Sequence, residues 1–269
     1  MSAPSNVPND IQRGLPTLPV PGSDLQIKLM RQWIAHCDTH HECQPGSDIR
    51  MPFRLVDIRG QPGRYGRLRL DSLRMDSSLH RKDRRYAVLS HRWASTDLNV
   101  QSRLNKANLK RWQTHLSCKS LPKRFQEAIL IARGLGLQYI WIDSLCIVQD
   151  DCEDTEREIS NMESVFSNAY VTISATCAVG RHVGFLRRET PRTCHPVYIP
   201  FKSDKQCRVY LCEPIDDFRQ HVEESELSRR GWIFQERALS RRILHFTSTQ
   251  LYWECGSDVR SEALTKFNK

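Results

Sequence analysis

The sequence of 269 residues predicts an α/β fold in which a parallel sheet is flanked by helices. Three short apolar runs have the character of buried strands, at residues 86–90, 139–142 and 170–175. Between them lie segments with apolar residues at i, i+3 and i+4, which is the pattern of a helix with one buried face. Strands that alternate with helices in this way favour a parallel sheet, because each crossover helix packs back onto the sheet.

A helix and two strands are expected before this core. Apolar spacing predicts a short helix over residues 25–34, a strand over 52–58 and an edge strand near 68–70, where leucines alternate with arginines. Five prolines and little apolar pattern predict a flexible arm over residues 1–24. We expect residues 25–80 to form a small amino-terminal subdomain.

The segment after the core departs from this alternation. Residues 176–227 read as an insertion, and within it two alternating runs separated by a polar turn predict a β-hairpin, Val197–Phe201 with Arg208–Leu211. A final helix is expected from Ser228 to Leu239. Two further strands follow, at residues 243–246 and 250–253.

Composition indicates a cytoplasmic globular protein. Hydrophobic residues make up 39% of the chain, and no apolar run approaches the roughly 20 residues needed to span a bilayer. The first residues lack the basic and apolar regions of a secretion signal. The ten cysteines are therefore expected to be reduced thiols rather than disulfides.

The formal net charge of +9 admits nucleic acid, acidic lipid or nucleotide phosphates as partners. The 40 lysines and arginines occur in short groups along the chain rather than in one basic tail. We interpret them as a solvated basic surface and do not expect nucleic acid to be a partner.

Metal-ligand residue types are grouped at Cys37, His40, His41 and Cys43. Zinc prefers such ligands, but a closed site needs four of them, the spacing matches no common zinc finger, and no second cysteine pair lies at a suitable distance along the chain. We predict no metal site and interpret the group as local packing, with Cys37, His40 and Cys43 as the alternative ligand set.

Polar residues follow two of the predicted strands. Ser90 and Arg92 end one of them, and Asp143 and Ser144 end the next. Arginine can hold a phosphate and aspartate can accept ribose hydroxyl hydrogen bonds, so these residues could bind a nucleotide without a glycine-rich loop. The alternative is that Asp143 and Ser144 only cap the following turn.

Two acidic residues are candidates for catalysis. Glu236 follows Trp232 by one helical turn, so the two share a helix face, and a carboxylate beside an aromatic ring can stabilise a ribosyl cation. The alternative is an ordinary exposed glutamate paired with Arg237 or Arg241. Glu158, at the start of another predicted helix, is the second candidate acid.

A thiol nucleophile is a further interpretation of the strand ends. Cys146 follows Asp143 by three residues, and His91 at the neighbouring strand end could serve as its base. The alternative is a cysteine that packs as a small hydrophobic residue.

Three sequence blocks resemble the fungal heterokaryon-incompatibility (HET) domain. They are Tyr86-Ala-Val-Leu-Ser-His-Arg-Trp93, residues 121–129 with 139–150, and Arg230-Gly-Trp-Ile-Phe-Gln-Glu-Arg-Ala-Leu-Ser240. The resemblance covers about residues 30–256; we assign residues 81–256 to the HET domain and residues 257–269 to a tail. Three positions depart from the family's pattern, which has tyrosine, glycine and tryptophan where this chain has His91, Ala94 and Thr155.

The resemblance implies a role in fungal non-self recognition and programmed cell death, and a flavodoxin-like fold similar to Toll/interleukin-receptor (TIR) domains. Some TIR domains cleave NAD with a glutamate four residues after a tryptophan, the spacing of Trp232 and Glu236. The implied catalytic residue is thus Glu236, with Glu158 as the alternative, and NAD is a substrate rather than a bound cofactor. The implied pocket residues are Ser90, Arg92, Trp93, Asp143, Ser144 and Trp232. The rival reading is a non-catalytic module that associates with itself or with an incompatibility partner protein.

Overall fold

The structure is a computed structural model of the chain. It describes residues 18, 20–44, 51–59, 67–72, 85–92, 103–177, 183–188, 197–200, 208–211, 216–228, 231–263 and 266–267. For the strands at 67–72, 197–200, 208–211 and 266–267 only the backbone is described.

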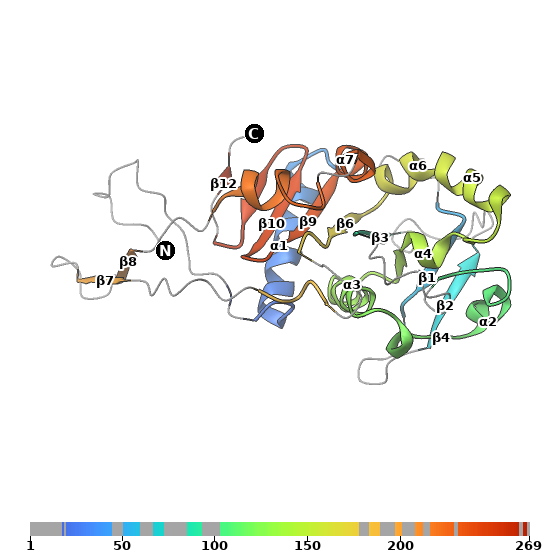
Figure 1. The fold of residues 1–269 in the computed structure, drawn as a ribbon. Helices are drawn as coiled ribbons and strands as arrows, with labels where there is room; N and C mark the ends of the chain where they lie inside the picture. The colour runs from blue at the N-terminus through green and yellow to red at the C-terminus, as the bar shows by residue number, and fades with distance from the viewer. Residues whose placement is uncertain are drawn as a thin grey trace.

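Four parallel strands form the centre of the main sheet (Figure 1). In chain order they are β3 (Tyr86–Ser90), β5 (Tyr139–Trp141), β6 (Val171–Ser174) and β9 (Arg242–Phe246). Their order in space is β5-β3-β6-β9, with parallel pairing throughout. Numbered by appearance this order is 2-1-3-4, and the predicted parallel core is confirmed.

Antiparallel strands extend the sheet on both sides, so the sheet is mixed rather than parallel throughout. Beyond β5 lie β1 (Arg54–Asp57), β2 (Arg67–Ser72) and β4 (Leu116–Ser117). Beyond β9 lie β10 (Leu251–Cys255), β11 (Val259–Ser261) and β12 (Lys266–Phe267). The expected amino-terminal subdomain thus supplies β1 and β2 to the main sheet, and the expected tail supplies β11 and β12. The strand predicted at the edge, β2, pairs with β4 as well as β1.

Helices cover both faces of the sheet. On one face α1 (Asp24–His40) contacts β10 and α3 (Lys123–Gly134), which itself contacts β3 and β5. On the other face α6 (Met162–Ser167) contacts α7 (Gly231–Leu239), as Figure 1 shows. None of the helices in the described ranges combines the length and the apolar character needed to span a bilayer.

The ends of α1 and α3 follow from their sequence. Ser23 caps α1, where its hydroxyl accepts a hydrogen bond from the Gln26 amide. Pro122 directly precedes α3, which needs no amide donor there. After α3 the backbone enters the left-handed region at Gly136, with φ of 79°, and the Leu137 amide donates to the Ala132 carbonyl over 3.0 Å. A glycine that follows a run of helical apolar spacing predicts such a helix end, and the structure confirms it at Gly136.

Two predicted helices differ from the structure. The apolar spacing of Ile159, Met162 and Phe166 predicts one amphipathic helix, but the structure divides this segment at Asn161 into α5 (Cys152–Ser160) and α6. Placing Ile159 on the buried face was wrong, because the break turns its side chain outward and leaves it 46% exposed. The apolar spacing over residues 104–116 yields only the short α2 (Leu109–Thr114).

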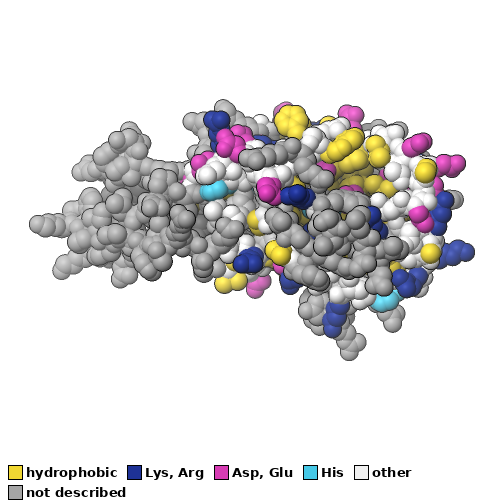
Figure 2. All heavy atoms as spheres, viewed as in Figure 1, with side chains coloured by type: hydrophobic (Ala, Val, Ile, Leu, Met, Phe, Trp, Pro, Cys, Tyr) yellow, Lys and Arg dark blue, Asp and Glu magenta, His cyan; other side chains and the backbone are white. Residues whose placement is uncertain are grey.

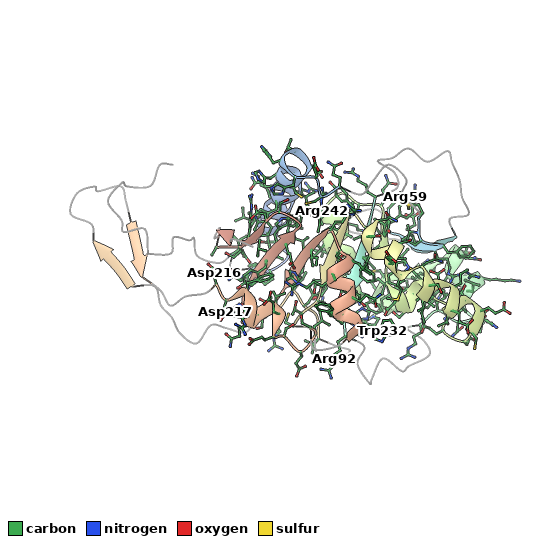
Figure 3. All side chains as sticks on the ribbon, turned by 90° about the horizontal axis from the view of Figure 1, so that it is seen from above. Arg59, Arg92, Asp216, Asp217, Trp232 and Arg242 are labelled. Atoms are coloured by element: carbon green, nitrogen blue, oxygen red, sulfur yellow. The ribbon has the colours of Figure 1, made fainter. Side chains whose placement is uncertain are left out.

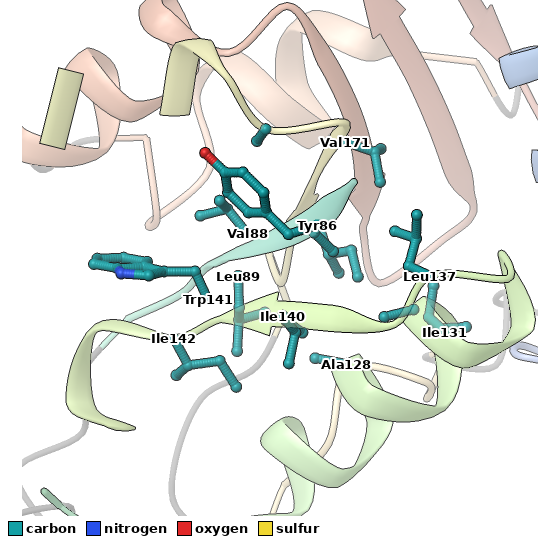
Figure 4. Packing of buried hydrophobic residues seen from close by; sticks show 14 of the residues in the cluster. Tyr86, Val88, Leu89, Ala128, Ile131, Leu137, Ile140, Trp141, Ile142 and Val171 are labelled. Carbon is teal, nitrogen blue, oxygen red and sulfur yellow. The ribbon is translucent and has the colours of Figure 1, made fainter. Parts of the chain in front are cut away.

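The core packs on both sides of the parallel strands (Figure 4). On the α3 side Ile140 faces Ala128 of that helix, as Figure 4 shows. On the other side Trp141 meets Phe166 of α6 edge to face, with ring centroids 6.0 Å apart. The Tyr86 hydroxyl donates to the Val165 carbonyl there over 2.8 Å. Parallel strands buried on both faces account for the near-continuous apolar runs in the sequence.

The insertion contains the predicted β-hairpin. Strands β7 (Val197–Pro200) and β8 (Arg208–Leu211) pair antiparallel and form a two-stranded sheet of their own. The predicted turn at residues 60–66 and most of the predicted arm lie outside the described residues.

Candidate functional site

Polar side chains line up where three of the parallel strands end. Ser90 of β3 is in register with Ser174 of β6, and Ser174 with His245 of β9. All three are buried. We call these three residues the polar edge. The strand order reverses between β3 and β6, which is where open α/β sheets place their ligands.

The structure brings the ends of β3 and β5 together, as predicted. His91 Nε2 lies 3.9 Å from Asp143 Oδ1, and the His91 ring meets Phe125 edge to face. Asp143 opens the one-turn helix α4 (Asp143–Cys146), and its carboxylate accepts a hydrogen bond from the Ser144 amide over 2.6 Å. This contact also fits the capping alternative, so the two readings of Asp143 both stand.

Arg92 lies on the surface beside the polar edge. Its Nη1 atom donates to Glu226 Oε2 over 2.6 Å, and both side chains are largely exposed. In Figure 3 Arg92 and Trp232 are drawn at the same edge of the molecule. A phosphate bound by Arg92 would displace Glu226 from an exposed ion pair, which costs little. Trp93 lies outside the described residues.

Helix α7 carries Trp232 and Glu236 and follows the third parallel strand. Its carboxyl end is fixed at the start of β6, where Ser240 Oγ lies 2.8 Å from Thr172 Oγ1. The amino end of α7 therefore points toward the carboxyl ends of the strands. Trp232, near that end, is 64% exposed. Glu236 is partly buried, and its Oε2 atom is enclosed.

A buried charge network under α7 was not predicted from the sequence. Glu254 of β10 accepts hydrogen bonds from His245 Nε2 over 2.9 Å and from Arg237 Nε and Nη2 over 2.9 and 3.0 Å. Burial acts to raise the pKa of Glu254, but the bonds from His245 and Arg237 outweigh it and hold that pKa well below its usual range. Alternation along β10 could have placed Glu254 on the His245 side of the sheet.

Arg237 is therefore engaged by Glu254 and, over 3.5 Å, by Glu223. Arg241 Nε donates to the Ser167 carbonyl over 3.0 Å. The alternative from the sequence paired Glu236 with Arg237 or Arg241. In the structure these two arginines bind Glu254, Glu223 and the Ser167 carbonyl.

Glu158 belongs to a different cluster. Its side chain is fully buried 3.5 Å from Arg54, whose guanidinium also bonds Asp154. Burial raises the pKa of Glu158. With no exposed surface, this carboxylate cannot touch a ligand in the present conformation, so the geometry favours Glu236 of the two acids.

The thiol of Cys146 is also fully buried, and burial raises its pKa to about 12. It is protonated at neutral pH, whereas a nucleophile must be a thiolate. The geometry favours its interpretation as a small hydrophobic residue.

The cysteine and histidine group near the end of α1 gains a member from β10. Potential ligand atoms of Cys37, His41, Cys43 and Cys255 all lie within 4.8 Å of one another. His40, named in the predicted alternative set, instead points its Nδ1 at the His36 carbonyl, 3.0 Å away. A hydrogen bond from Cys37 lowers the pKa of Cys255 to about 4 and raises that of Cys37. The sequence could not show Cys255 as a member, because it lies 214 residues from His41.

Comparison with known protein families gave one match. The model of the family described as heterokaryon incompatibility protein (HET) matches residues 86–236, which is more than half of the chain. The match begins with β3 and ends at Glu236 on α7, so it includes Ser90, Asp143 and Ser174. No curated protein and no solved structure matched. The chain belongs to the heterokaryon incompatibility (HET) family.

Proposed function

We propose that this protein acts in fungal non-self recognition and programmed cell death, as its HET domain implies. The observation that carries this proposal is the family match over β3 to α7, the segment that builds most of the parallel core and the polar edge. The 2-1-3-4 order of the parallel strands supports the finer expectation of a TIR-like, flavodoxin-like core, because flavodoxin-like sheets begin with the same order.

The chemistry that best fits this edge is hydrolysis of the bond between nicotinamide and ribose in NAD. In that reaction the C1′–N bond breaks, nicotinamide leaves with the bonding electrons, water adds its hydroxyl to C1′, and the remaining proton goes to solvent. Glu236 would stabilise the positive charge that develops on the ribose or hold its hydroxyls. The Trp232 ring, on the same helix face, would pack beside the ligand.

The remaining pocket residues would bind the rest of the dinucleotide. Arg92 would exchange Glu226 for a phosphate, which its planar guanidinium can hold with two hydrogen bonds. Ser90, Asp143 and Ser144 would line the pocket at the ends of β3 and β5, and Trp93 is proposed from its sequence position alone. Two features support this assignment: the carboxyl ends of β3 and β6 adjoin at the reversal of strand order, and α7 follows the third parallel strand.

The proposal is tested by NAD loss and nicotinamide release from the purified chain at high protein concentration. Glu236→Ala should abolish turnover, and Glu236→Gln should reduce it strongly, because both remove the charge that faces the ribosyl cation. Gln235→Ala is the matched control, since Gln235 is exposed on the same helix. Equal turnover in Glu236→Ala and the parent would exclude Glu236 as the catalytic residue.

The second candidate function is a non-catalytic module that assembles with itself or a partner. It is favoured by two aromatic side chains on α7, Trp232 and Phe234, which are 64% and 71% exposed. Exposed aromatic rings are enriched where proteins associate. Light scattering measures this assembly. Assembly of the parent without NAD loss, together with no assembly of the double variant Trp232→Ala/Phe234→Ala, would favour this function over catalysis.

A further inference from the structure

Four side chains of zinc-binding type converge between α1 and the end of β10. Cys37 lies in the last turn of α1, His41 and Cys43 follow that helix, and Cys255 ends β10. Their potential ligand atoms all lie within 4.8 Å of one another. Two stretches of backbone far apart in the sequence, residues 37–43 and the end of β10, therefore deliver ligands to one point.

We propose that these four residues bind a single zinc ion in a closed structural site. A tetrahedral zinc ion with Zn–S bonds of about 2.3 Å and Zn–N bonds of about 2.0 Å places the ligand atoms of three cysteines and one histidine about 3.5–3.8 Å apart. His41 Nδ1 and Cys255 Sγ are already 3.5 Å apart. The limit of 4.8 Å on the other pairs means that each need close by no more than about 1.3 Å, within the reach of side-chain rotation.

Burial distinguishes the group from surface thiols. Cys37, Cys43 and Cys255 are 0%, 7% and 2% exposed. None of the cysteines in the described segments forms a disulfide, so these three are reduced, and their sulfur atoms lie close to each other and to an imidazole. A thiol is a weak hydrogen-bond donor and a weak acceptor, whereas a thiolate is a strong ligand for zinc.

The surroundings suit thiolate ligands. The backbone amide of Ser257 donates to Cys255 Sγ, and Ser257 Oγ lies 3.9 Å from Cys43 Sγ. Arg242, buried in β9, lies near enough to Cys37 for its positive charge to act on that thiol. Three thiolates and one zinc ion carry a net charge of −1, which these donors and this cation stabilise.

A carboxylate lies near the histidine ligand. His41 also shares a group with His36 and Asp258, again with candidate ligand atoms within 4.8 Å. Zinc-bound histidines commonly direct their second ring nitrogen at a carboxylate, which fixes the ring and strengthens its basicity. Asp258 fits that role, and it follows the turn that carries Ser257.

The site would be structural rather than catalytic, because all four zinc positions are filled by protein atoms. It would tie α1 to the β10–β11 hairpin and would lie on the opposite side of β10 from Glu254 and α7. The inference is independent of NAD cleavage, which involves none of these four residues.

Metal analysis of the full chain, purified without chelator, tests the proposal. We expect about one zinc per chain in the parent and at least a tenfold loss in Cys255→Ser and Cys43→Ser. His40→Ala and Cys152→Ser are matched controls that should retain the metal, because His40 is the neighbour turned away and Cys152 is exposed outside the group. His41→Cys should retain zinc and His41→Ala should lose it.

A second measurement covers variants that fail to fold. Cobalt added to the parent after chelation should give the absorption bands of tetrahedral thiolate coordination. Absence of these bands, a parent that stays free of zinc when zinc is supplied, or a Cys37–Cys255 disulfide found by alkylation of the unreduced protein would overturn the proposal. Equal zinc loss in His40→Ala and Cys255→Ser would do so too.

Discussion

The buried polar side chains on the two faces of β10 have different kinds of partner. On the α7 face, Glu254 is bonded by Arg237 and His245, so the chain itself provides the opposite charge. On the α1 face, Cys255 meets two further cysteines and a histidine, all of which can donate electron pairs to the same point. A polar cluster made of complementary charges stabilises itself, whereas a cluster of electron-pair donors has the composition that a metal ion binds. That contrast distinguishes a stabilising network from a binding site within one strand.

The largest expected effect is on the α1 face. We assume that zinc binds the folded chain and not the unfolded one. With free zinc at 1,000 times Kd, removal of the metal by a chelator should then lower the free energy of unfolding by about 4 kcal/mol. Urea unfolding with and without a strong chelator measures this difference. The Cys255→Ser variant serves as the control, since its unfolding should not respond to chelator. Identical unfolding of the parent in both conditions would remove the contrast between the two faces.

On the α7 face the expected effect is slightly smaller. Glu254→Ala leaves the Arg237 guanidinium and His245 without their shared carboxylate, and we expect a loss of about 3 kcal/mol in the free energy of unfolding. Glu224→Ala removes an exposed pair with Arg219 and should cost about 0–1 kcal/mol. Similar costs for the two variants in urea titrations would show that the Glu254 network is no stronger than a surface ion pair.

The α7 face should also make the stability of the protein depend on pH. Burial lowers the pKa of His245 and His221, so the unfolded chain takes up protons first and stability falls as pH drops below about 6.5. The lowered pKa of Glu254 adds a second decline as pH falls below about 4.3, where the unfolded carboxyl is protonated and the folded one is still ionised.

Urea unfolding from pH 8 to about pH 2.5 checks both steps. The His245→Gln variant should lose part of the decline near pH 6. A parent whose stability rises as the solution is acidified from pH 7 to pH 5 would be incompatible with these shifts.

The smallest effect is expected on the outer side of α7. Trp232→Ala should change the free energy of unfolding by no more than about 0.5 kcal/mol, because its ring is mostly exposed. Its effect should instead appear in self-association or NAD turnover. A loss of more than 2 kcal/mol would place this ring in the core and contradict the exposed surface used in both proposed functions.

The sequence predicted the parallel core because its signals are local. Apolar runs bounded by helix patterns identify β3, β5 and β6, and Gly136 marks the end of α3 through its own backbone preference. The antiparallel strands at both edges were harder to predict as parts of one sheet. Their pairing, such as β1 with β5, depends on contacts between distant segments that no short window contains.

The candidate site was predicted in part for the same reason. Ser90 and Asp143 follow strands whose ends adjoin, so the strand rule alone brings them together. Ser174 also ends a strand and could have been included by that rule. His245 and Glu254 required knowledge of which hairpin flanks the core. His41 rather than His40 joins the cysteine group because α1 ends at His40. The position of a helix end cannot be predicted from sequence to better than one or two residues.

The union of α1 with β10 has a consequence for synthesis of the chain. His41 leaves the ribosome 214 residues before Cys255, so its full set of neighbours can assemble only late in translation. Closing so long a loop is slow compared with forming the helices, since nonlocal contacts are reached after much conformational freedom has been lost. Until then Cys37 and Cys43 can be oxidised or can bind other metal ions. In an oxidising cell, nascent chains would therefore be more prone to misfold than finished ones.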